Sequence, residues 1–122
     1  MSVVNNDIPL VLAYTGSGGS AAQASALQVN PYGRGIKLFI NCSAYTSGSF
    51  TVAVQGVLNG LVYSALTSAA ISAAGITELT VYPGLTAAAN TVANDILPRQ
   101  WQVTLTPTAL VGVVNIGASV IV

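Results

Sequence analysis

Two runs of alternating residues, GIKLFINC (residues 35–42) and FTVAVQGVL (residues 50–58), constrain the fold of this chain more than any other feature. In both runs an apolar residue recurs at every second position, which is the period of a strand with one buried face. The residues on the predicted inward face are Ile36, Leu38, Ile40, Cys42, Phe50, Val52 and Val54. The two runs therefore predict two strands of a half-buried sheet.

The dipeptide Asn59-Gly60 separates the second run from another apolar segment that begins at Leu61. Both central residues of a type I′ turn need positive φ, and Asn-Gly adopts it at low steric cost. The dipeptide therefore predicts a tight hairpin, and the stretch from Arg34 to Leu66 predicts three successive antiparallel strands.

The remaining chain contains further short runs with strand character between turn residues. They lie at residues 8–14, 76–82, 100–106, 110–114 and 116–122, and residues 67–75 are interpreted as extended. Residues 20–27 fit either a helical turn or a short strand, because their alanines favour helix and their length does not. About eight short strands with little helix predict an all-β fold, an antiparallel β-sandwich or jelly-roll-like arrangement.

The predicted division places an N-terminal arm with one edge strand at residues 1–20 and a single β-sandwich domain at residues 21–122. Pro9 fits an edge, because a proline cannot donate to a ladder of strands. Trp101 is predicted as the largest core residue of the second half of the chain. The full set of predicted core anchors is Trp101, Phe50, Ile36, Leu38 and Ile40.

Charge is the unusual part of the composition. Only 5% of the residues are charged and the net charge is zero, whereas roughly 25% are charged in ordinary soluble domains. Such a surface has little self-repulsion and associates readily. We therefore expect a homo-oligomer, a dimer or trimer, with part of the apolar run from Ala109 to Val122 buried between subunits.

The same run raises the question of a membrane segment. It is shorter than the roughly 20 residues of a spanning helix, and Asn115 and Ser119 interrupt it. The N-terminus lacks the pattern of a signal peptide. We therefore expect no membrane partner, and we interpret Cys42 as a small buried hydrophobe.

The inventory of reactive residues predicts no catalytic, cofactor or metal site. The chain contains no histidine and only three carboxylates, Asp7, Glu78 and Asp95. A catalytic serine needs a base such as histidine to activate its hydroxyl. A zinc site needs several ligands, and the chain has one thiolate and no imidazole. Glu78 is expected to face solvent, and Asp95 is expected to pair with Arg99 in a local ion pair. Three dispersed cations make no basic face, so no nucleic-acid partner is expected.

A glycine-rich stretch, residues 16–21, matches the G-x-G-x-x-A form of a dinucleotide fingerprint. That fingerprint needs an acidic residue about 20 positions later and a βαβ unit. Neither follows here, so we interpret the stretch as a connecting loop.

Arg34 lies between Gly33 and Gly35 at the start of the first run. Its guanidinium can anchor a partner's carboxylate through two parallel hydrogen bonds. Alternatively, it satisfies carbonyl groups of its own turn. Both interpretations stay open at this point.

Four segments carry a resemblance to a known family: NPYGRGIKLFIN (30–41), SGSFTVAVQG (47–56), VYPGL (81–85) and NDILPRQWQV (94–103). Over roughly residues 30–122 the chain resembles small all-β virion proteins of tailed bacteriophages, often of the capsid decoration or cement type. The resemblance implies a virion protein on the capsid surface that binds and stabilises the major capsid protein shell. It brings no catalytic residues.

Contacts to such a shell are expected from turns and arms, because the inward strand faces belong to the core. The candidate partner-binding residues are Arg34, Ile8, Pro9 and Leu10. A head–tail connector or tail component is the alternative within virions. A carbohydrate-binding or adhesin β-sandwich is the more distant alternative. It would need clustered exposed aromatics, and the five tyrosines are scattered.

Overall fold

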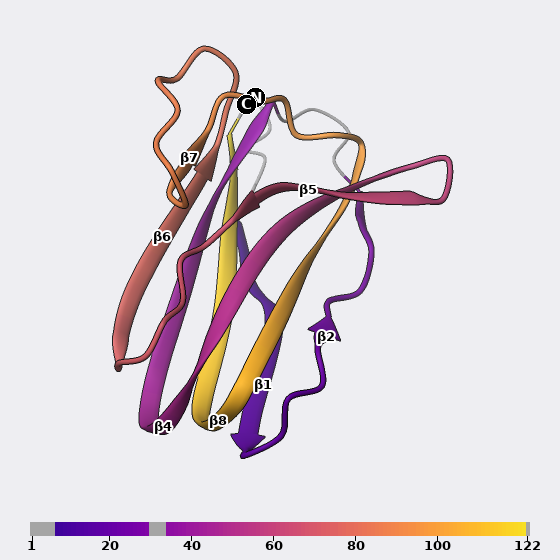
Figure 1. Ribbon diagram of the computed structural model, residues 1–122. Coiled ribbons are helices and arrows are strands. Elements are labelled where there is room, and N and C mark those ends of the chain that lie inside the picture. The colour runs from indigo at the N-terminus through magenta and orange to yellow at the C-terminus, as the bar shows by residue number, and fades with distance from the viewer. Residues whose placement is uncertain (1–6, 30–33, 122) are drawn as a thin grey trace.

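The computed structural model describes residues 7–29 and 34–121, and within these ranges the chain forms strands and no helix (Figure 1). The all-β prediction is confirmed. The strands are β1 (Asp7–Ser17), β2 (Gln23–Ala24), β3 (Gln28–Val29), β4 (Gly35–Leu58), β5 (Leu61–Thr67), β6 (Gly75–Val81), β7 (Val92–Ala93) and β8 (Gln100–Ile121). The predicted turn at residues 30–33 and the N-terminal residues 1–6 lie outside the described residues.

Two long strands, β4 with 24 residues and β8 with 22, organise the sheet. They pair antiparallel from Gly35 opposite Ile121 to Val57 opposite Gln100. Both strands bend over at one end of the molecule, and their four extremities lie together at the other end (Figure 1). We call that other end the open end.

The prediction of short strands is wrong for β4 and β8, because the ladder between them continues through the bend. Two register shifts between Cys42 and Ser47 each add one residue to β4, and the shift between Ser47 and Ser49 adds one to β8. Backbone at positive φ turns the chain at Gly48 (84°) and Ala109 (50°). Such bulges bend a strand without ending its pairing. The predicted final pair of strands, 110–114 and 116–122, is likewise one continuous strand up to Ile121, and Val122 lies outside the described residues.

Pro107 does not end its strand as predicted; it lies inside β8, opposite Phe50. Hydrogen-bonded and non-hydrogen-bonded pairs alternate along an antiparallel ladder. The backbone N of Phe50 donates to Ile71 O on the side away from β8, so position 107 faces away from β4 as well. On that side β2 pairs no further than Leu105, and β1 begins at Val111. The missing proline donor therefore costs the ladder nothing.

The bend divides the sheet into two halves. The β1 half contains β1, residues 35–42 of β4, residues 112–121 of β8, and β6; the β5 half contains residues 50–58 of β4, residues 100–108 of β8, β5, β2 and β3. All strands belong to one sheet, and β6 and β7 pair in parallel, so the sheet is mixed. The expectation of purely antiparallel pairing is corrected at this one pair.

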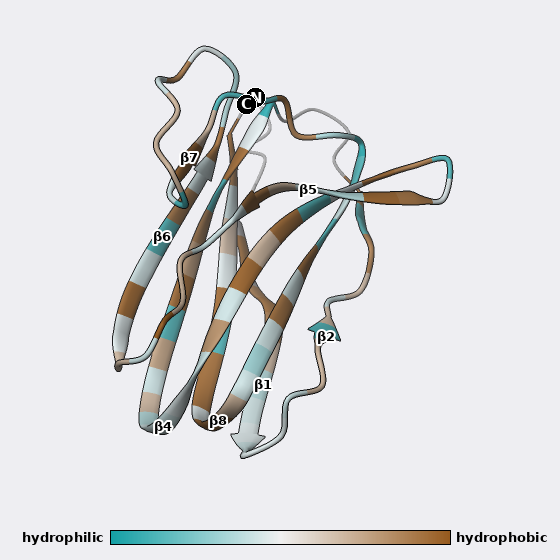
Figure 2. Cartoon of the chain, in the orientation of Figure 1, coloured by the Kyte–Doolittle hydropathy of each residue, from teal (hydrophilic) through white to brown (hydrophobic). Residues whose placement is uncertain are grey.

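Alternate residues of both halves form a single core cluster. The five predicted core anchors are each at most 1% exposed. Figure 2 shows the alternation as brown and pale bands along the strands. The C-terminal apolar run also belongs to this core, because β8 lies between β1 and β4 and buries Leu110, Val114 and Ile116. Burial within one chain thus accounts for these three side chains, and the subunit interface expected in this run stays a prediction.

Two buried serines, one on each side of the β5 half, bond to the backbone of a central strand in the same way. Ser25 follows β2, where its Oγ accepts from Val103 N at 2.9 Å and its backbone N donates to Val103 O. Ser68 follows β5, where its Oγ accepts from Val52 N at 2.9 Å and its backbone N donates to Val52 O. Each serine therefore provides hydrogen-bond partners for the backbone N–H and C=O of a central strand, at the point where the flanking strand ends.

Candidate interaction surfaces

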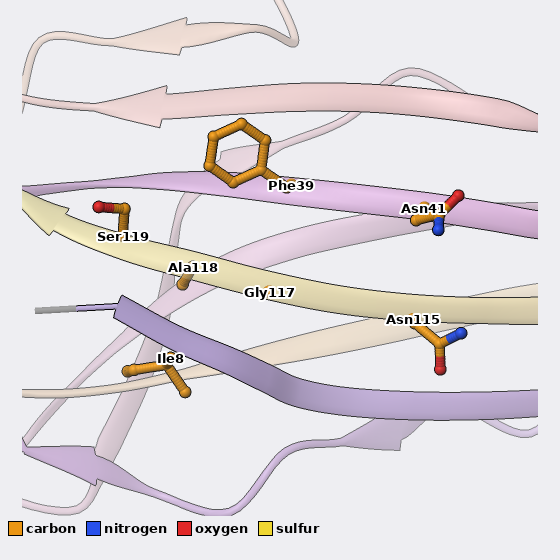
Figure 3. A pocket seen from close by; sticks show the side chains of 7 residues that line it. All are labelled: Ile8, Phe39, Asn41, Asn115, Gly117, Ala118 and Ser119. Atoms are coloured by element: carbon orange, nitrogen blue, oxygen red, sulfur yellow. The ribbon is translucent and has the colours of Figure 1, made fainter.

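A groove of about 540 Å³ lies on the outer face of the β1 half (Figure 3). Its lining residues come from three neighbouring strands: Ile8 of β1, Phe39 and Asn41 of β4, and Asn115, Gly117, Ala118 and Ser119 of β8. Phe39 and Asn41 alternate with the core residues of β4, so their side chains point outward. The sequence pattern therefore places polar and aromatic groups together on this face.

Gly117 creates the groove, because it stands opposite Phe39 and has no side chain to fill the space beside the ring. Asn41 and Asn115 are also opposite one another, and the Asn115 side chain extends from β8 toward β1 (Figure 3). Next to the groove, Lys37 Nζ lies 3.6 Å from Glu78 Oε2 and 5.6 Å from the centroid of the Phe39 ring. Glu78 is exposed, as predicted. The groove offers amides and one aromatic ring.

The candidate residues on β1 lie at an irregular edge. Ile8 is half-buried opposite Ala118, and the next recorded pair is Leu12 with Ile116, so residues 9–11 form a bulge. Leu10 is 56% exposed within this bulge. Pro9 belongs to the same backbone segment, in agreement with its predicted edge position.

Arg34 is tied to the open end by its backbone. Its N donates to Ile121 O at 2.8 Å, and its carbonyl accepts from Leu97 N at 2.8 Å. Its side chain is exposed and has no hydrogen bond or ion pair among the described residues. The alternative interpretation concerns carbonyl groups of residues 30–33, which lie outside the described residues, so both interpretations stay predictions. The structure places Arg34 beside β8 on the side opposite the β1 candidates.

Exposed apolar side chains gather at the tip of the hairpin formed by β4 and β5, and they were not predicted from the sequence. They are Leu58, Leu61, Val62 and Tyr63, exposed by 63%, 73%, 51% and 42%, and we call them the hairpin patch. The tip projects beyond the rest of the sheet (Figures 1 and 2). Asn59 and Gly60 have φ of 51° and 79°, which confirms the predicted turn.

The base of the hairpin is fixed to the sheet. Gly56 stands opposite Tyr63, and a Cβ at Gly56 would collide with the Tyr63 ring and with Pro98. Glycine is therefore needed here for the ring to lie over the backbone. A signal for the patch exists in the sequence: no charged residue occurs between Lys37 and Glu78, and apolar residues occupy both faces of the hairpin next to the turn.

A second, apolar hollow of about 400 Å³ lies between residues 69–77, which form a loop and the start of β6, and the turn at residues 89–91. Five of its twelve lining residues are alanines, and Ile71 and Ile76 are its large apolar side chains. Asn90 fixes the turn by donating to Thr67 O at 3.0 Å. The hollow therefore belongs to loops that complete the sheet, and it contains no reactive side chain.

The reactive side chains are dispersed. Cys42 is buried, its Sγ donates to Ala44 O at 3.4 Å, and burial raises the pKa of its thiol. The predicted ion pair between Asp95 and Arg99 is wrong; the Asp95 carboxylate accepts from Ile96 N at 2.8 Å instead. Among the described residues, no three potential metal ligands are grouped together.

The glycine-rich stretch joins β1 to β2. Gly16 and Ser17 still belong to β1, and Gly18 N donates to Leu110 O at 2.9 Å, next to the bend of β8. Residues 18–22 form the connection, and no helix follows within the described residues. The loop interpretation therefore holds for the second part of the stretch, and its first part is strand.

Comparison of the chain with models of protein families, with curated proteins and with solved structures gives no significant match. No helix capable of crossing a bilayer occurs in the described part of the chain. The surfaces of the chain itself, above all the exposed apolar side chains of the open end, indicate what it binds.

Proposed function

We propose that this protein is a capsid decoration protein of a tailed bacteriophage. In this role it acts without catalysis: as a homo-oligomer it binds the outside of the shell built from the major capsid protein, and it stabilises that shell. The resemblance at residues 30–103 supports the choice of a virion protein. The surface chemistry of the open end supports the choice of a protein partner.

The observation that carries the proposal is the gathering of exposed apolar side chains at the open end. Val29, Leu58, Leu61, Val62 and Ile96 are each more than half exposed. Ile96 precedes Leu97, whose N donates to Arg34 O, and Val29 pairs with Gln100, which pairs with Val57 next to the hairpin. Leu58, Leu61 and Val62 lie on the hairpin that projects from this end (Figure 1). Apolar patches with a nearby arginine are typical of protein–protein interfaces.

Stabilisation of a shell follows from mass action. A protein that binds only the assembled shell shifts the equilibrium toward assembly, by an amount that grows with its concentration relative to Kd. Linking several weak contacts in one oligomer raises the overall affinity without a new contact. Arg34 would supply the directional part of each contact, because its guanidinium forms paired hydrogen bonds with a carboxylate.

We also propose that the bent sheet is a β-sandwich in which the two halves face one another. The single core cluster with residues of both halves supports this arrangement. The Trp101 ring should then show nuclear Overhauser contacts to methyl groups of Ile36 and Leu38. A spectrum in which Trp101 contacts only residues of the β5 half would contradict it.

The proposal is tested by mixing the purified protein with undecorated shells and measuring bound protein and the temperature of shell rupture. The wild-type protein should bind and raise that temperature. Arg34→Ala should lower the affinity, whereas Lys37→Ala, which removes the same charge from the outer face of the β1 half, should not. Deleting residues 1–10 should lower binding while the circular dichroism stays that of a β protein.

Two outcomes would overturn the assignment. Failure of the wild-type protein to bind expanded shells would exclude decoration. Tight binding to a portal or tail component instead would identify the connector alternative.

A further inference from the structure

The edges of the sheet differ in how well they are protected against pairing with another chain. The β1 edge carries Pro9 and the bulge at residues 9–11, and β7 consists of two residues. Proline, bulges, charges and short length are the usual protections of an edge. From Leu61 to Ser64, β5 has none of them: it contains no proline and no charge, and its register with β4 is unbroken.

The turn determines which backbone groups of β5 are unpaired. In a two-residue hairpin the flanking pair, here Leu58 and Leu61, is hydrogen-bonded, and bonded pairs then alternate. Leu61 and Tyr63 therefore bond to β4, and the N–H and C=O groups of Val62 and Ser64 point away from the sheet. Within the described residues no strand other than β4 pairs with β5. The occupant of this edge must be an extended strand, because only a strand offers donors and acceptors at matching intervals.

We propose that β5 pairs antiparallel with β5 of a second copy, about a two-fold axis at Tyr63. In this register Val62 stands opposite the partner subunit's Ser64, and Ser64 opposite the partner subunit's Val62. Both outward N–H and both outward C=O groups of each copy then find a partner. Leu61 faces the partner subunit's Ala65, which covers part of the hairpin patch. The interface is thus self-complementary, as a two-fold dimer requires.

Charge favours a second copy over an unrelated strand. Residues 38–77 contain no Asp, Glu, Lys or Arg, so two identical edges approach without repulsion and bury no charge. The inference rests on the proposed function for the choice of a homo-oligomer and names its interface. It leaves Arg34, Val29 and Ile96 for the shell. Because dimerisation is measured without shells, its failure is distinguishable from a failure of shell binding.

The test places charges at the two outward positions of β5 and measures self-association by sedimentation equilibrium. In V62K/S64K each lysine faces a lysine of the partner, and like charges directly opposite destabilise a pair of strands. We expect the dimer Kd to rise roughly tenfold or more. In V62K/S64E each lysine faces a glutamate, so the dimer should return. T106K/T108K, which adds the same charge at exposed positions of β8, should dimerise like the wild type.

Hydrogen exchange provides a second readout. The amides of Val62 and Ser64 should exchange more slowly as protein concentration rises, and the circular dichroism of all variants should match the wild type. A wild-type monomer at micromolar concentration would overturn the inference. Undiminished dimerisation of V62K/S64K would also overturn it, and so would failure of V62K/S64E to restore the dimer.

Discussion

The two halves of the sheet share the same two strands and differ in what flanks them. In the β1 half, β1 and β6 run along β8 and β4 as long strands, and the core side chains are mainly aliphatic. In the β5 half, β8 is flanked by two strands of two residues each, the largest core residues are Trp101 and Phe50, and the hairpin projects from the other side. The shared ladder of β4 and β8 therefore has long flanking strands in the β1 half. In the β5 half, the outer edge of β5 pairs with no other described strand.

The largest expected effect tests whether the β5 half depends on its aromatic core. Trp101→Ala should lower the free energy of unfolding by about 3–5 kcal/mol, because it empties a large buried site. Urea denaturation followed by circular dichroism measures this loss. A loss below about 1 kcal/mol would contradict the inward face assigned to residues 101–105.

Trp101→Phe is the matched variant. The indole Nε1 is buried and has no hydrogen-bond partner among the described residues. Burying an unsatisfied donor costs stability, and phenylalanine removes that donor while keeping a ring. Trp101→Phe should therefore retain most of the stability that Trp101→Ala loses.

An intermediate effect tests whether the two buried serines substitute for flanking strands. Ser25→Ala and Ser68→Ala should each lower the free energy of unfolding by about 1–3 kcal/mol, because each leaves a buried backbone N–H unsatisfied. Ser43→Ala, at an exposed position of β4, should stay within about 0.5 kcal/mol of the wild type. Hydrogen exchange in Ser25→Ala and Ser68→Ala should accelerate mainly in the β5 half. Equal acceleration in both halves would contradict a specific role of the serines in the β5 half.

The smallest effect belongs to the β1 half. Lys37 and Glu78 form an ion pair with side chains 40% and 51% exposed. A double-mutant cycle with Lys37→Ala and Glu78→Ala should give a coupling below about 1 kcal/mol, and salt should weaken it. A larger coupling energy that did not change with salt would contradict the description of Lys37 and Glu78 as an exposed, weakly stabilising ion pair.

Local pattern predicted the parts of the fold that depend on neighbours in sequence. The period of two identified the inward residues of β4 and of residues 101–105, and Asn59-Gly60 identified the hairpin. The bend was not predictable in this way. Its turn in β8 falls at Ala109, a residue without the usual preference for positive φ, and it is held by the register with β4.

The candidate surfaces were predicted only in part. Arg34 and Leu10 are exposed, as a partner-binding role requires. The hairpin patch was missed because the alternation of β4 predicts burial for Leu58. Burial also needs contact with the core cluster, and the hairpin projects beyond the rest of the sheet. Whether an apolar strand end is core or surface thus depends on the lengths of elements distant in sequence.

The pairing of β4 with β8 has a consequence for synthesis of the chain. Gly35 pairs with Ile121, so the central ladder is complete only after residue 121 has been synthesised. Pairings this distant in sequence fold slowly, on the order of milliseconds to seconds. Until β8 pairs, the edge of β4 that it covers has no partner, and Lys37 is the one charged residue of β4. The chain is therefore most prone to aggregation in the interval before residues 100–121 pair with β4.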